Sequence, residues 1–236
     1  MKRLILVHSD KGGVGKSHAT HHTAAALKQV RHPVTLVDGD PNNPGLHRLF
    51  DGKPDPVLRI NVRKPEGIDE LLDLFLSGSC DVIVDLPAGG SELTDGFIQD
   101  RPEVGKTDIE ALFRQTGDRL VILFVMDQSR DSMVALNHEI TRLPAGVTDW
   151  IIVRNGRIDG PFKYLETWLE KPGREGLTII DMPALDRRVI DLLVDTKSHI
   201  GEIDDVAEAS LLSKMRAKAA LRIWREELTK AGLING

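Results

Sequence analysis

The chain has 236 residues, of which 41% are hydrophobic and 28% are charged, so it can bury a substantial core and fits one large domain. Its formal net charge of −5 excludes a protein that coats nucleic acid over its whole surface, although a local basic patch stays open. Cys80 is the single cysteine, which excludes an intramolecular disulfide and favours a reducing, cytoplasmic location.

Short runs rich in Val, Ile and Leu recur along the chain, with segments of helical length between them. The runs cover residues 3–7, 34–38, 81–85, 120–125, 150–153 and 177–180. Because they do not alternate with polar residues, they predict strands buried on both faces of a parallel sheet. Helical periodicity predicts helices within 16–30, 67–78, 131–143 and 160–170. The sequence therefore predicts an α/β fold, with a mostly parallel β-sheet flanked by helices on both faces.

Two stretches lack regular periodicity. Prolines and glycines punctuate residues 50–67, which we expect to form a loop around a short strand. The second stretch, residues 88–108, follows the third predicted strand. Both are expected near the strand ends where ligands bind in α/β sheets. The first apolar run, residues 4–7, is too short for a signal peptide or a membrane span.

Residues 8–20 read HSDKGGVGKSHAT and contain most of a phosphate-binding loop. The loop follows a predicted strand and opens a predicted helix, which is the context that this motif requires. Asp10 occupies the position of the usual first glycine, and Lys11 follows it. An ordinary glycine turn between strand and helix is the alternative, but such a turn does not need the Gly-Lys-Ser ending.

Each residue type in this loop suits a phosphate ligand. Gly12, Gly13 and Gly15 let consecutive N–H groups point at one anion, beside the positive end of the following helix. Lys16 would neutralise the β- and γ-phosphates of a nucleotide, and the Ser17 hydroxyl would bind Mg²⁺.

Three aspartates follow the second and third predicted strands. Asp38 and Asp40 come after the second, and Asp85 ends the third. Such residues are often helix caps or turn residues. Because parallel strands place their carboxyl ends at one edge, we expect all three beside the phosphate loop. Asp38 and Asp85 then suit Mg²⁺ binding, Asp85 through water, and Asp40 would orient the water that attacks the γ-phosphate.

The motifs KGGVGKS, VDGDPNNP and DVIVDLPAGG resemble those of the deviant Walker A ATPases of the ParA/MinD group, a P-loop NTPase family. The resemblance covers Met1 to about residue 190. It implies ATP and Mg²⁺ as cofactors, ATP hydrolysis, and a homodimer that forms on ATP binding. It also implies that Lys11 reaches across the dimer to the partner's nucleotide, as an arginine finger does. A solvated loop lysine is the alternative.

The resemblance further implies a set of nucleotide contacts: Gly12, Gly13, Val14, Gly15, Lys16, Ser17, His18, Asn155 and Pro183. Asn155 is expected at the adenine, and the segment around Pro183 is expected on the other side of the base. An Asn before Gly is also a common turn residue. The chain departs from the family at His18, where threonine is frequent, and at PNNP, where many members have PQGN.

The cysteine and tyrosine counts argue against two branches of this family. One cysteine argues against iron–sulfur carriers, which use two cysteines per subunit, and the single tyrosine, Tyr164, argues against tyrosine autokinases. Partition, conjugative transfer and cargo positioning remain, with a stimulating partner protein of centromere-binding, cargo or transfer type. The alternatives are a metabolic ATP-dependent ligase, whose group usually lacks the early lysine, and an adaptor that binds nucleotide without hydrolysing it.

We expect a single domain over residues 1–236, with a C-terminal helix at about 204–230 and no separate DNA-binding domain ahead of the phosphate loop. Lys214, Lys218, Arg222 and Arg225 fall within about 80° of one another on that helix. Two apolar lines flank this basic stripe, namely Leu212, Met215, Ala219 and Ile223, and Ala217, Leu221, Trp224 and Leu228. One line is expected to pack on the domain.

Six basic and two acidic residues between 213 and 230 give this segment a net charge of +4. The basic stripe therefore suits a polyanion, with nonspecific DNA as the first choice and an anionic membrane surface as the second. A solvated helix face is the alternative.

His18 and His22 form an i, i+4 pair that suits a metal in principle. We expect ordinary packing or solvent exposure instead, because no cysteine or third ligand with zinc-like spacing is evident and zinc there would crowd the nucleotide.

Overall fold

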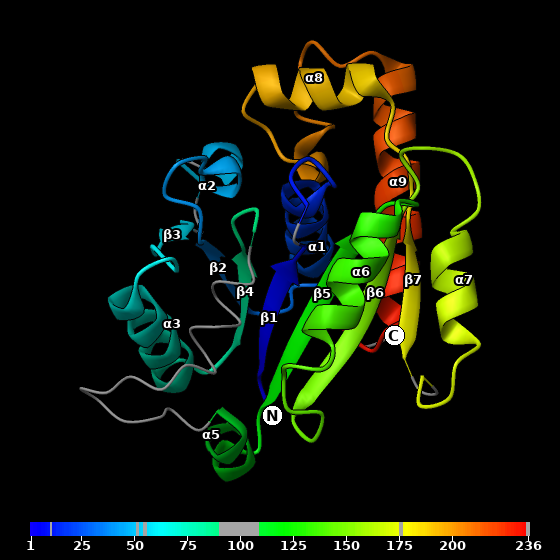
Figure 1. Cartoon of the computed structure of the whole chain (residues 1–236). Helices are drawn as coiled ribbons and strands as arrows, with labels where there is room; N and C mark the ends of the chain where they lie inside the picture. The colour runs from blue at the N-terminus through cyan, green and yellow to red at the C-terminus, as the bar shows by residue number, and fades with distance from the viewer. Residues whose placement is uncertain (10, 51, 54–55, 90–108, 175–176, 235–236) are drawn as a thin grey trace.

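The computed structural model describes residues 1–9, 11–50, 52–53, 56–89, 109–174 and 177–234. In this part of the chain seven strands form one sheet in the order β3-β2-β4-β1-β5-β6-β7, with helices on both faces (Figure 1). Every strand pair is parallel. The predicted α/β class and the mostly parallel sheet are confirmed.

Six strands follow the apolar runs closely, and a seventh lies outside them. Their bounds are β1 Arg3–His8, β2 Val34–Asp38, β3 Leu58–Arg59, β4 Asp81–Asp85, β5 Arg119–Met126, β6 Thr148–Asn155 and β7 Thr178–Met182. The two-residue β3 is the short strand expected within 50–67. The central strands are buried on both faces, which explains why their sequences are continuously apolar.

Successive residues of β1 face two separate cores. Ile5 and Val7 pack on one face of the sheet, whereas Leu4 and Leu6 pack on the other. The first core lies under α1 Lys16–Gln29, α2 Gly45–Phe50, α8 Arg187–Asp195, the 3₁₀ helix η1 Ile200–Glu202 and α9 Leu211–Lys230. The second lies under α3 Pro65–Ser77, α5 Ile109–Thr116, α6 Arg130–Glu139 and α7 Lys163–Leu169.

The predicted helices α1, α3, α6 and α7 are present, with ends shifted by a few residues. The short helices α2, α5 and α8 were not predicted. Most of the irregular stretch 88–108 lies outside the described residues. Among the described helices, none combines the length and apolar character that crossing a membrane requires.

The C-terminal helix differs from its predicted bounds. It begins at Leu211 rather than near residue 204, because the Ser210 side chain caps it by accepting a hydrogen bond from the Ser213 N–H. Its buried residues include the apolar line Ala217, Leu221, Trp224 and Leu228. Trp224 is fully buried, and its Nε1–H donates to Thr23 Oγ1 on α1 at 3.1 Å. The line with Leu212, Met215 and Ile223 stays exposed.

Candidate functional site

The carboxyl ends of β1, β2 and β4 meet at one edge of the sheet. Asp85 pairs in register with Val7 on one side and with Asp38 on the other. A cavity of about 250 Å³ opens at this edge. It is lined by Gly13, Gly15, Lys16, Ser17, His18, Asp40, Asn43, Asp85, Leu86 and Ala88. The fold thus brings most of the predicted phosphate and metal ligands around one cavity.

The loop between β1 and α1 has the backbone that an anion site needs. Gly13 and Gly15 have φ values of +73° and +103°, which L-residues with a side chain rarely adopt. Lys16 opens α1 and is buried, and its Nζ donates to the Lys11 carbonyl at 3.3 Å. The loop therefore presents a curled backbone, a buried cation and a helix N-terminus to the same cavity. Asp10 lies outside the described residues.

Asp85 is the most deeply buried carboxylate of the cavity. Its Oδ1 accepts a hydrogen bond from Thr20 Oγ1 at 2.9 Å, and Ser17 donates a second one. Burial raises the pKa of Asp85 to about 7, against the opposing effect of these hydroxyls and of Lys16. A buried carboxylate with a raised pKa is one that lacks a strong counter-charge, which is what a bound cation would supply.

Asp38 and Asp40 differ in their surroundings. Burial raises the pKa of Asp38, whose Oδ1 and Oδ2 accept from the N–H groups of Asp40 and His47. Asp40 Oδ1 accepts from the N–H groups of Asn42 and Asn43, at 3.0 and 3.2 Å. Asp40 therefore caps a turn, as the alternative interpretation expected, and still lines the cavity.

Lys11 is held within its own chain. Its Nζ donates to Asp127 Oδ2 at 2.7 Å and to Ser129 Oγ at 3.3 Å. Burial alone would raise the pKa of Asp127, but hydrogen bonds from Lys11, Ser129 and Ser132 hold it well below its usual range. Asp127 is thus ionised at neutral pH, and the Lys11 side chain, 42% exposed, rests against it.

Asn155 and Pro183 lie on the β6–β7 side of the loop. Asn155 Nδ2 donates to the Val14 carbonyl at 2.7 Å, and its Oδ1 accepts from the Arg157 N–H. Asn155 also pairs in register with Met182, which Pro183 follows. The structure therefore places Asn155 against the phosphate loop, and Pro183 directly after the residue that pairs with Asn155.

None of the four residues of the basic stripe of α9 lines this cavity, and three of them have acidic or carbonyl partners. Lys214 Nζ donates to the Asp204 carbonyl at 2.7 Å, and Lys218 Nζ lies 2.6 Å from Asp204 Oδ2. Arg222 donates to Glu226 one turn further along, at 2.9 Å. Two of the four predicted positive charges, Lys218 and Arg222, are thus paired with carboxylates.

Two residues of the site were missed in the sequence. Thr20 lies one turn after Lys16 on α1, so the helical period would have placed it on the side of Asp85. Asp127 directly follows β5, which neighbours β1. The strand-end rule that selected the three aspartates would have selected Asp127 as well.

Comparisons with known proteins agree with this geometry. The family model described as "ParA: NUBPL iron-transfer P-loop NTPase" matches residues 1–92. Protein MobD of Acidithiobacillus ferrooxidans is 27% identical over 237 residues, which cover 97% of this chain and 96% of MobD.

Two solved structures share the fold. The septum site-determining protein MinD of Pyrococcus horikoshii OT3, complexed with Mg-ADP, has a TM-score of 0.59 at 15% identity and covers 98% of both chains. A protein of Borrelia burgdorferi B31, described as a plasmid partition protein and bound to AMPPNP, has a TM-score of 0.55 at 13% identity. That match covers 98% of this chain and 100% of the other.

The phosphate loop at the carboxyl edge of a parallel sheet defines a P-loop NTPase. With Lys11 ahead of the glycines and the matches above, the chain is similar to P-loop NTPases of the ParA/MinD type.

Proposed function

We propose that the protein is an ATP-dependent dimerising switch that hydrolyses ATP with Mg²⁺ and acts in DNA partition, transfer or cargo positioning. The observation that carries the proposal is the convergence of Lys16, Ser17 and Asp85 on one cavity at the carboxyl edge of the sheet. This combination provides a phosphate cradle and hard oxygen ligands in the same place.

The donor set fits a magnesium ion. Ser17, Asp38 and Asp85 offer oxygen atoms, and the raised pKa values of the two carboxylates indicate uncompensated negative charge. Bound Mg²⁺ would neutralise charge on the β- and γ-phosphates. Lys16 would bind the same phosphates from the helix N-terminus, and Asp40, at the rim of the cavity, would orient the attacking water.

The adenine is assigned to Asn155 and Pro183. Asn155 already fixes the Val14 carbonyl of the phosphate loop, so a base held there would be rigidly placed relative to the phosphates. His18 lies at the wall of the same cavity, where its backbone N–H, in the first turn of α1, would face the α-phosphate and leave the imidazole ring for other contacts.

Dimerisation is assigned to Lys11. Its side chain is 42% exposed, and its ion pair with Asp127 is of the partly solvated kind that contributes little stability. Lys11 can therefore exchange Asp127 for the more highly charged phosphates of a partner subunit's nucleotide at small cost.

A nucleic-acid role is assigned to the basic stripe of α9, formed by Lys214, Lys218, Arg222 and Arg225. The similarity in fold to a protein described as a plasmid partition protein supports DNA as the polyanion. The ion pairs with Asp204 and Glu226 are exposed, so phosphates can replace these carboxylates. A partner protein that stimulates hydrolysis would complete the cycle.

Iron transfer, which appears in the description of the matching family model, is not carried over to this chain. Its one thiol, Cys80, precedes β4 and so lies at the opposite edge of the sheet from the phosphate loop. Two copies of the chain would bring two thiolates, whereas clusters of the Cys₄ type require four.

The decisive test measures binding to a fluorescent random-sequence DNA duplex, with ATP and with ADP, across a salt titration. We expect binding with ATP that weakens steeply with salt and is lost when the four basic residues of the stripe are replaced by alanine. The matched control removes four exposed basic residues outside α9, namely Arg114, Lys163, Lys171 and Arg187. Equal loss in both variants, or no binding in either nucleotide state, contradicts the DNA assignment.

Hydrolysis is tested by phosphate release. We expect magnesium-dependent release from the wild type and at least about a tenfold decrease for Asp40→Ala, because a water-orienting residue acts in the chemical step. Full turnover in this variant contradicts the assignment of Asp40. No release from the wild type, with nucleotide binding retained, would indicate the non-hydrolysing adaptor.

A second candidate is an anionic membrane surface. The exposed line with Leu212, Met215 and Ile223 lies beside the basic stripe, as in helices that rest at a lipid interface. ATP-dependent binding to vesicles containing phosphatidylserine, lost on Leu212→Asp and Met215→Asp, would favour this candidate over DNA.

A further inference from the structure

Three imidazole rings gather on the first two turns of α1. His18, His21 and His22 occupy positions i, i+3 and i+4, which share one side of a helix. One ligand atom from each ring lies within 4.8 Å of the others. The ring centroids of His18 and His22 are 3.9 Å apart, and those of His21 and His22 are 4.7 Å apart. The third ligand that the sequence pattern did not reveal is His21.

Hydrogen bonds to the helix backbone fix two of the three rings. His22 Nδ1 lies 2.8 Å from the His18 carbonyl oxygen, which can only accept, so Nδ1 carries the proton. His21 likewise donates to the backbone of Ser17. Among the described residues, Nε2 of His21 and Nε2 of His22 have no hydrogen-bond partner, although both atoms are buried.

Each of these two Nε2 atoms therefore keeps a buried lone pair that no described donor satisfies. A buried polar atom without a partner costs free energy, so the arrangement needs a compensating ligand. A histidine that binds a metal commonly donates its other ring N–H to a backbone carbonyl, as His21 and His22 both do. Burial also lowers the pKa of His18 to about 4 and holds the other two well below their usual range, so neutral imidazole is the form present.

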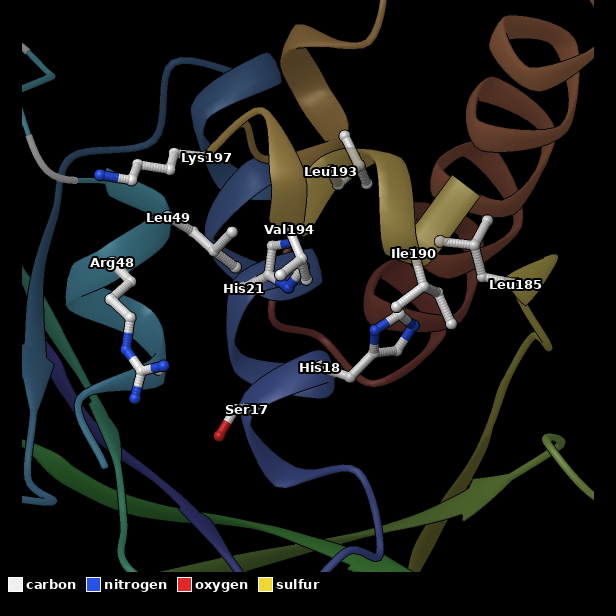
Figure 2. Close-up of a pocket in the computed structure, with 11 residues that line it drawn as sticks. Ser17, His18, His21, Arg48, Leu49, Leu185, Ile190, Leu193, Val194 and Lys197 are labelled. Carbon is white, nitrogen blue, oxygen red and sulfur yellow. The ribbon is translucent and has the colours of Figure 1, made fainter. Parts of the chain in front are cut away.

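The cluster borders a cavity of about 310 Å³ between α1, α2 and α8. Figure 2 shows His18 and His21 on α1 and Leu193 and Val194 on α8, all of which line this cavity. This cavity leaves room for a fourth ligand, such as water, beside three protein ligands. His18 also lines the phosphate cavity and forms part of the wall that the two share.

We propose that His18, His21 and His22 form a site for a divalent transition-metal ion, with Zn²⁺ as the expected occupant. Three nitrogen donors favour Zn²⁺, Co²⁺, Ni²⁺ or Cu²⁺ over Mg²⁺, which prefers oxygen. The site is therefore distinct from the carboxylate and hydroxyl ligands assigned to Mg²⁺, and it does not depend on ATP hydrolysis.

Binding requires a modest closure of the cluster. Nitrogen ligands of a tetrahedral zinc ion lie about 3.3 Å apart, given Zn–N distances near 2.0 Å. The histidine ligand atoms, within 4.8 Å of one another, must therefore approach by at most about 1.5 Å. Rotation of the partly exposed His18 side chain provides most of this movement, because His21 and His22 are held by their backbone hydrogen bonds.

The test titrates the metal-free full-length protein with Co²⁺ and then Zn²⁺ in excess Mg²⁺, which saturates oxygen-ligand sites. We expect one equivalent of Co²⁺ with the visible absorption bands of a tetrahedral site, displaced by Zn²⁺. His18→Ala should weaken Zn²⁺ binding at least about tenfold, since it removes one ligand of three. The matched control is His138→Ala, which removes an exposed histidine on α6 and should leave the affinity unchanged.

His22→Gln provides a second test, with circular dichroism to verify folding because the side chain is buried. If this variant does not fold, the thermal shift decides: Zn²⁺ should raise the Tm of the wild type and of His138→Ala but not that of His18→Ala. The proposal is overturned if the wild type binds no Zn²⁺ in excess Mg²⁺, or if His18→Ala binds it as tightly as the wild type.

Discussion

Lys11 Nζ lies 2.7 Å from Asp127 Oδ2, so the lysine assigned to a partner's nucleotide is bound to a carboxylate of its own chain. Dimerisation through Lys11 requires this ion pair to break. Since the ion pair is partly solvated, it contributes little stability and restrains the position of the Lys11 side chain only weakly.

The first prediction concerns this restraint. Lys11→Ala should abolish ATP-dependent dimerisation while ATP binding is largely kept. Asp127→Ala should instead promote dimerisation by up to about fivefold, because an exposed ion pair contributes at most about 1 kcal/mol. Analytical ultracentrifugation with a non-hydrolysable ATP analogue measures both.

A matched control is Asp149→Ala, which removes the exposed partner of Arg119 in a different ion pair and should not change dimerisation. If Asp127→Ala abolishes dimerisation as Lys11→Ala does, the restraint model is wrong.

The second prediction concerns the phosphate loop. A Cβ at Gly15 would lie 2.6 Å from Asn155 Nδ2, and the φ of +103° disfavours any side chain. Gly15→Ala should therefore displace Asn155 from the Val14 carbonyl and weaken nucleotide binding by about tenfold or more. Fluorescent ATP-analogue titration measures the affinity.

Gly12→Ala is the control for the loop. A Cβ at Gly12 would meet no described atom within 4 Å, and its φ is not positive. Nucleotide binding should stay within about threefold of the wild type, since alanine keeps the backbone N–H. Equal losses in the two variants would show that Gly15 has no special conformational role.

The third prediction concerns Asp85 and pH. Its pKa of about 7 in the folded protein lies above the ordinary aspartate value of about 3.9 in the unfolded chain. Between these values the folded protein binds the extra proton, so the contribution of Asp85 to the free energy of unfolding falls as pH rises from about 4 to 7. Asp85→Asn removes this penalty.

We therefore expect the stability of Asp85→Asn relative to the wild type to increase by roughly 2–3 kcal/mol between pH 5 and pH 8 in metal-free buffer. Urea unfolding of both proteins across this range measures the difference and cancels the contribution of the buried histidines. A stability difference that does not vary with pH contradicts the raised pKa.

The fourth prediction concerns the docking of α9. Trp224→Ala should lower the free energy of unfolding by about 3–5 kcal/mol, because it opens a cavity against α1 and leaves Thr23 without its donor. Ile223→Ala, at a side chain 38% exposed, should cost less than about 1 kcal/mol. Urea unfolding distinguishes the two, and similar losses would mean that α9 docks through a different face.

Local sequence patterns were sufficient to predict the strands and helices whose own residues carry a clear apolar run or helical periodicity. The apolar runs predicted the central strands because a strand buried on both faces carries no polar alternation. The helices α2 and α8 escaped prediction because they are short, and the buried side chains that hold them, such as Phe50 and Val189, contact residues distant in sequence. The start of α9 was placed too early because the cap at Ser210 is one serine among several polar residues.

The sequence by itself determined the phosphate loop, the three strand-end aspartates and the parallel sheet, since each depends on residue type within a short span. Only the tertiary structure decided that Lys11 forms an ion pair with Asp127 and that the Thr20 hydroxyl donates a hydrogen bond to Asp85. It also decided that one apolar line of α9 stays exposed. It further decided that the rings of His18, His21 and His22 gather, and that Nε2 of His21 and of His22 has no hydrogen-bond partner among the described residues. These relationships depend on which strands are neighbours and on which atoms burial leaves without water, and both are properties of the folded chain rather than of any segment.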